Sequence, residues 1–128
     1  MKKKYLIVIA DYYTDISSGL LKSAINALPK MSFIKIIKVP GVFEIPVTIS
    51  KNIKKYDAFL ALGCVIKGQT PHFDFISHAS TDAIMKLSIE NNKPIGNGII
   101  TCLNLRQAIA RKKKGREAAQ AVISVLSQ

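Results

Sequence analysis

Residues 58–75 read AFLALGCVIKGQTPHFDF, an apolar run that passes through a short polar turn into a second apolar pattern. An uninterrupted apolar run of this length is typical of a strand that is covered on both faces of a sheet. Pro71 favours the first turn of a helix, and Thr70 can cap that helix. The stretch therefore predicts a buried strand, a tight connection and a helix.

The rest of the chain repeats this alternation. Apolar and β-branched runs at residues 5–10, 32–39 and 95–101 predict three more strands, which we also expect to be mostly buried on both faces. Apolar residues at helical spacing lie between the strands and again in the tail, at residues 118–125. Alternating strands and helices imply parallel strands joined by right-handed crossovers. We expect one domain over residues 1–128, an α/β fold with a three-layer α/β/α sandwich around a four-stranded parallel sheet.

The composition is compatible with several classes of function. The chain has 128 residues, 48% of them hydrophobic, which is enough for a core without disulfides. A net charge of +11 favours phosphorylated ligands, RNA, DNA or an anionic membrane surface without choosing among them. Cys64 and Cys102 lie far apart and form no CxxC pair, so we expect no disulfide framework and no zinc site. No apolar run reaches the roughly 18 residues of a membrane span, and we expect a soluble protein in the reducing cytoplasm.

Ligands of open parallel sheets bind beyond the carboxyl ends of the strands. His72 follows one of these ends, at the start of a helix whose free amides favour anions. The sequence KGQTPH at residues 67–72 therefore resembles a phosphate cradle, although it lacks the GK[ST] of a Walker A motif. The simpler alternative is a capped helix with an exposed histidine of no function.

Aromatic and acidic residues follow two other strands. Phe43 and Glu44 come directly after a glycine turn, and Tyr12 and Tyr13 follow the first strand. An aromatic face beside a hydrogen-bond acceptor suits a heterocycle that carries hydroxyl groups. Each feature also has a structural alternative, since a first-turn glutamate is favoured by the helix dipole and tyrosines pack on helices.

Other patterns carry weaker signals. Cys64 and His72 could act as a nucleophile and its base, but Cys64 falls within an apolar strand, where a structural thiol is expected. His72 and His78 could bind a metal ion together, but their spacing places them on different faces of the helix. The GxG at residues 96–98 lies in a strand and does not fit a dinucleotide fingerprint. The run RKKKGR at residues 111–116 indicates a solvated face or a contact with an anion or nucleic acid.

Four segments together resemble the 6,7-dimethyl-8-ribityllumazine synthase family: VPGVFEIP, YDAFLALGCVIKGQTPHFD, GIITCLNLRQAIAR and KGREAA. They occur in the order and spacing of that family over almost the whole chain. The resemblance implies a flavodoxin-like fold and a transferase of riboflavin biosynthesis that needs no metal or cofactor. This enzyme condenses 5-amino-6-(D-ribitylamino)uracil with 3,4-dihydroxy-2-butanone 4-phosphate and releases the lumazine, phosphate and water.

The resemblance also implies roles for particular residues. His72 is the expected catalytic residue, which shuttles protons, and Arg111 of a neighbouring subunit is expected to bind the phosphate together with Gln69 and Thr70. Asn97 occupies a position where many family members have a phenylalanine that packs on the ring. The pyrimidine and its ribityl chain are expected to contact eight residues: Tyr12, Val42, Phe43, Glu44, Cys64, Val65, Ile66 and Asn97.

The same resemblance implies a homo-oligomer, most simply a pentamer with active sites between subunits, and riboflavin synthase as a partner. We expect neither membrane nor nucleic-acid binding. The alternative function is a module on the same scaffold that binds a flavin, a lumazine or RNA without catalysis. An RNA binder would lose affinity steeply with salt and would not respond to the two substrates.

Overall fold

The computed structural model describes residues 2–68 and 71–128. Its elements alternate along the chain as β1 (Lys4–Ala10), α1 (Thr14–Ala27), β2 (Phe33–Val39), η1 (Val42–Glu44), α2 (Ile45–Lys51), β3 (Ala58–Ile66), α3 (His72–Asn91), β4 (Ile95–Cys102), α4 (Leu105–Ala110) and α5 (Gly115–Leu126). The four predicted strands are confirmed, and their ends agree with the predicted ranges to within one residue.

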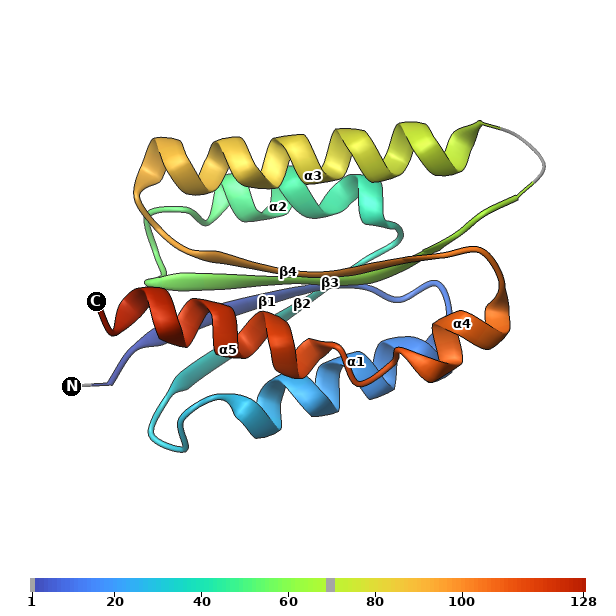
Figure 1. Cartoon of the computed structure of the whole chain (residues 1–128). Coiled ribbons are helices and arrows are strands. Elements are labelled where there is room, and N and C mark those ends of the chain that lie inside the picture. The colour runs from blue at the N-terminus through green and yellow to red at the C-terminus, as the bar shows by residue number, and fades with distance from the viewer. Residues whose placement is uncertain (1, 69–70) are drawn as a thin grey trace.

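The strands form one parallel sheet in the order β2-β1-β3-β4. Helices α2 and α3 cover one face, and α1, α4 and α5 cover the other (Figure 1). The predicted flavodoxin-like sandwich of three layers is therefore confirmed. Because β2 and β3 lie on opposite sides of β1, the connections leave β1 and β3 toward different faces, which opens a crevice at their carboxyl ends.

Alternate residues of β1 fill two separate cores. Ile7 and Ile9 pack toward Leu20 of α1, whereas Leu6 and Val8 pack toward Ile49 of α2. All four strand side chains are almost fully buried. This alternation fixes the register of the central strand, because a slip of one residue would exchange the two cores.

The expectation that all four strands are covered on both faces is correct only for the central pair. Strands β1 and β3 are buried along most of their length, but β4 alternates between buried and exposed residues, and most of β2 is exposed or half-buried. The sheet order agrees with the difference, since β2 and β4 are the edge strands and each has a neighbouring strand on one side only. Phe33 and Ile36 of β2 remain exposed as a result.

The GxG of residues 96–98 serves packing. A Cβ on Gly96 would lie 2.3 Å from the carbonyl oxygen of Ala118, and one on Gly98 would lie 2.5 Å from Leu62 Cδ2. Gly96 thus allows α5 to lie directly on β4, and Gly98 makes room for the side chain of Leu62 on β3. Within the described ranges, no helix has both the length and the apolar character needed to cross a bilayer.

Candidate active site

A cavity of about 710 Å³ lies at the carboxyl ends of β1, β2 and β3. It occupies the crevice that the strand order creates, at one end of the sheet. Its lining includes Ala10, Tyr12, Tyr13, Pro40, Gly41, Val42, Phe43, Glu44, Cys64, Val65, Ile66, His72 and Ile76. Segments distant in sequence thus meet at one place, as the topology predicts.

Two tyrosines form one aromatic wall. The rings of Tyr12 and Tyr13 meet edge to face, with centroids 4.9 Å apart. Tyr12 is 73% exposed, whereas Tyr13 is half-buried, and burial raises the pKa of the Tyr13 phenol. Tyr13 therefore presents the better-fixed ring, although the sequence alone could not separate the two residues.

Phe43 and Glu44 stand on the opposite side, in the single turn η1 that leads into α2. Phe43 is 63% exposed, so its ring is available to a ligand. A Cβ on Gly41 would lie 3.1 Å from Glu44 Oε1, which shows that the carboxylate folds back over the glycine turn. Thr48 Oγ1 donates to the Glu44 carbonyl oxygen at 2.8 Å and fixes the backbone of this turn.

The end of β3 forms the floor of the cavity. Cys64, Val65 and Ile66 are half-buried there, and Val42 fits against Gly63, where a Cβ would lie 2.8 Å from Val42 Cγ2. Burial, with a smaller effect of Cys102, raises the pKa of the Cys64 thiol to about 12. Because only a thiolate is a good nucleophile, the thiol is inert at neutral pH, which disfavours the Cys64–His72 alternative.

His72 is the first residue of α3 and lies at the edge of the cavity, exposed to solvent. Helix α3 begins there, with Pro71 at the N-cap, one position later than the sequence suggested. Gln69 and Thr70, expected to bind phosphate, fall outside the described residues. No three His, Cys, Asp or Glu side chains in the described part of the chain are grouped to hold a metal ion.

Asn97 and Arg111 do not reach this cavity within one chain. They line a separate hollow of about 340 Å³ along β4, together with Thr101, Lys114 and Glu117. Arg111 Nη1 donates to the Thr101 carbonyl oxygen at 3.2 Å, and Asn97 Oδ1 accepts from the amide of Ile99 at 3.0 Å. Sequence reasoning did not single out Lys114, whose position beside Arg111 arises from the turn before α5.

The chain is similar to known proteins over its whole length. The model of the 6,7-dimethyl-8-ribityllumazine synthase family matches residues 2–128. A protein of Bartonella tribocorum with that name is 42% identical and aligns with 99% of this chain and 91% of its own. The protein of the same name from Bartonella henselae is 43% identical and aligns with 98% of this chain and 88% of its own. The one from Buchnera aphidicola is 41% identical and aligns with 98% of this chain and 84% of its own.

Proposed function

The chain belongs to the 6,7-dimethyl-8-ribityllumazine synthase family, and from this premise we propose how its residues divide the work. The enzyme is a transferase of riboflavin biosynthesis. It condenses 5-amino-6-(D-ribitylamino)uracil with 3,4-dihydroxy-2-butanone 4-phosphate to form 6,7-dimethyl-8-ribityllumazine, phosphate and water. The observation that carries the assignment of the site is the meeting of two aromatic walls, a carboxylate and a histidine in one cavity.

The pyrimidine substrate occupies the cavity at the ends of β1, β2 and β3. Its flat ring stacks on Tyr12 and faces Phe43, over the floor formed by residues 64–66, with Val42 behind it. Glu44 accepts hydrogen bonds from the ribityl hydroxyls. The exposure of Tyr12 and Phe43 supports this arrangement, because each ring lines the cavity and keeps a face available for an aromatic ligand.

His72 moves protons. Formation of the imine, loss of phosphate and closure of the second ring each transfer protons between nitrogen, carbon and oxygen. An imidazole can accept a proton at one ring nitrogen and donate a proton from the other, so one side chain can serve successive steps. Its place at the edge of the cavity supports this role, since an exposed imidazole there lies beside the proposed pyrimidine site.

The phosphate of the second substrate binds to Gln69, Thr70 and Arg111, with Arg111 supplied by a neighbouring subunit. Asn97 enters the pyrimidine site from the same neighbour. The separate hollow that holds Asn97 and Arg111 supports this division, since the two residues lie together but away from the cavity of their own chain. An arginine beside backbone amides suits a leaving phosphate.

The functional unit is a homo-oligomer, in the simplest case a pentamer. Helix α3 supports this proposal, because it exposes Phe75, Met85 and Ile89, at 68%, 59% and 67% of their surfaces. An exposed apolar helix face of this kind is typical of a protein contact surface. The fivefold ring itself is implied by the family resemblance.

Three further proposals complete the assignment. Residues 1–128 form one lumazine synthase domain. The enzyme works in the cytoplasm, which agrees with the free thiols of Cys64 and Cys102. Riboflavin synthase is the partner that receives the product, since this reaction is the penultimate step of the pathway.

The experiment that tests the function mixes the purified protein with both substrates and follows the fluorescence of the lumazine. Product formation that depends on protein is expected, faster than the uncatalysed reaction under the same conditions. A module that only holds a flavin or lumazine would bind the product without accelerating its formation. An RNA binder would bind RNA in a strongly salt-dependent manner and leave the reaction rate unchanged.

A further inference from the structure

A second large cavity lies on the other side of the molecule, between α1 and α5. It has a volume of about 760 Å³ and runs beside α1 from Asp15 to Ala27, which corresponds to about 18 Å of helix. We call it the α1–α5 groove. It is lined by Asp15, Ser18, Gly19, Lys22, Ser23, Asn26, Ala27, Lys112, Lys113, Arg116 and Gln120.

Positive charge dominates the α1–α5 groove. Four cationic side chains line it, and among its described lining residues Asp15 is the only acidic one. Asp15 Oδ2 lies 3.5 Å from Lys112 Nζ, so this carboxylate offsets one of the four charges. The hydroxyls and amides of Ser18, Asn26 and Gln120 add neutral hydrogen-bond donors. The groove thus favours a ligand with several negative charges and many acceptor oxygens.

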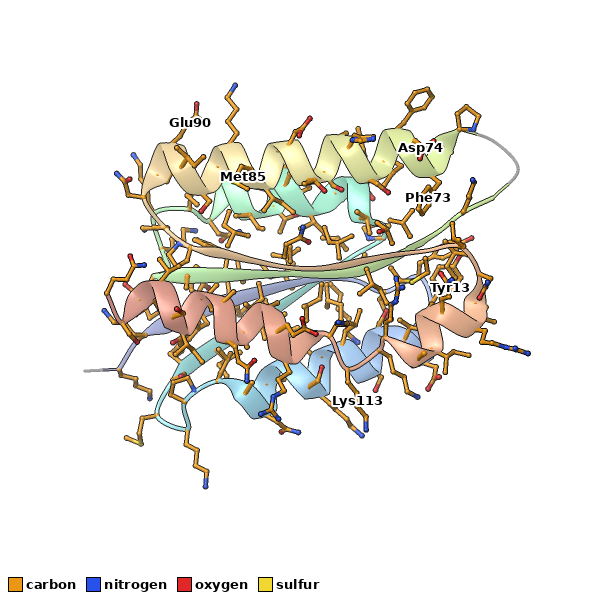
Figure 2. All side chains as sticks on the ribbon, viewed as in Figure 1. Tyr13, Phe73, Asp74, Met85, Glu90 and Lys113 are labelled. Atoms are coloured by element: carbon orange, nitrogen blue, oxygen red, sulfur yellow. The ribbon has the colours of Figure 1, made fainter. Side chains whose placement is uncertain are left out.

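Close helix packing gives the groove a defined floor. A Cβ on Gly115 would lie 2.0 Å from the Leu20 carbonyl oxygen, so the backbones of α1 and α5 touch at this glycine. A Cβ on Gly19 would lie 2.9 Å from Lys112 Cγ, so the stem of Lys112 lies flat on α1. The cations therefore stand on a rigid base, and Lys113 extends on the α1 side of the molecule (Figure 2).

The turn before α5 distributes its cations between two sites. Arg111 and Lys114 line the hollow along β4, whereas Lys112, Lys113 and Arg116 line the α1–α5 groove. The proposed role of Arg111 in phosphate binding assigns no function to Lys112, Lys113 and Arg116. In a charge run that serves only solvation, we would not expect three cations to line one concave site together with Lys22 of a different helix.

We propose that the α1–α5 groove binds linear oligophosphates, chains of linked phosphates without a large apolar part. The lining favours this class over single-stranded RNA, because none of its described residues is aromatic and stacked bases would find no platform. A flexible chain of phosphates can also reach several of the cations that line the groove more readily than a rigid duplex can.

Calorimetric titration of the full-length protein with sodium tripolyphosphate tests the proposal. The groove variant Lys22→Gln/Lys113→Gln/Arg116→Gln is compared with Lys30→Gln/Lys51→Gln/Lys54→Gln, which loses the same charge at exposed positions elsewhere. We expect the dissociation constant to rise by about tenfold or more in the groove variant and by less than about threefold in the control. Thermal unfolding of both variants checks that each is folded. An equal loss of tripolyphosphate affinity in both variants would overturn the proposal, because it would indicate that net charge alone attracts the ligand.

Two further measurements separate the groove from other sites and ligands. Arg111→Gln changes the proposed active site and should lower tripolyphosphate affinity less than the groove variant does. A loss confined to Arg111→Gln would place the ligand in the active site and overturn the proposal. Inorganic phosphate should bind more weakly than tripolyphosphate, and equal affinity would contradict a site for linked phosphates. An oligouridylate with the same number of phosphates should bind no more tightly than tripolyphosphate, and tighter binding would overturn the assigned ligand class.

Discussion

Glu44 and Arg111 lie in different hollows of the same chain, one after the edge strand β2 and the other beside the opposite edge strand β4. Arg111 is held there by its hydrogen bond to the Thr101 carbonyl oxygen, 3.2 Å long. A site that needs both side chains is therefore incomplete in one chain. The proposed active site requires a second copy that brings its β4 edge to the cavity of the first.

Glu44→Gln and Arg111→Ala proteins should restore activity to each other when they are unfolded together and reassembled. Random mixing places the two intact residues at about one subunit boundary in four, because each boundary takes one side from each copy. The measurement is lumazine formation by the mixture, with each variant refolded alone as the control. A mixture no more active than the average of its parts, despite proven subunit exchange, would place the whole site within one chain.

Glu44→Gln should weaken binding of the pyrimidine substrate by about 1.5–3 kcal/mol, the usual value of hydrogen bonds to a charged group. Affinity for the butanone phosphate should not change. Titration of each substrate separately measures both effects, and Glu90→Gln, at the far end of α3, is the matched control. Equal weakening of both substrates would argue against contact between Glu44 and the ribityl chain.

His72→Ala should slow turnover by about 10²-fold, near the low end for general acid–base groups, because two reactive substrates held together gain most of their rate from positioning. KM should change little. His78→Ala removes the other histidine of α3, which does not line the cavity, and should behave like the parent. Full loss of activity in His72→Ala together with an unaffected Arg111→Ala would refute the assigned roles.

The thiol of Cys64 should make the fold sensitive to high pH. Its pKa rises from 9.0 to about 12 in the folded protein, so between these values the unfolded chain loses a proton that the folded chain keeps. Stability therefore falls as pH rises through this window, by at most about 1.4 kcal/mol per pH unit. Urea unfolding from pH 8 upward should show a flatter decline for Cys64→Ala than for the parent. Parallel declines would mean that the thiol ionises equally in both states.

Gly96→Ala should destabilise the protein by about 1–3 kcal/mol or more, because the new methyl group would meet the Ala118 carbonyl and force α5 off β4. Gly68→Ala is the matched control, since a Cβ there has no heavy atom within 4 Å. The control should stay within about 0.5 kcal/mol of the parent in urea unfolding. A similar cost at both positions would show that the contact with Ala118 does not explain the glycine at position 96.

Much of the fold follows from local pattern. The apolar runs at residues 5–10 and 58–66 predict the two central strands because a strand with helices on both faces has no polar side, and the alternation with helices then predicts parallel pairing. The ends of these strands predict where the cavity lies. Motifs around Glu44 and His72 identify the family, and the cavity brings both residues together.

Tertiary structure decides what depends on packing between distant segments. It distinguishes Tyr13 from Tyr12 by burial, raises the pKa of Cys64, and explains Gly96 by the approach of α5. It also divides the cations of residues 111–116 between two hollows. In the sequence, the same residues form one block of charge. Burial, desolvation and backbone contact arise between segments far apart along the chain, and periodicity within one segment carries no information about them.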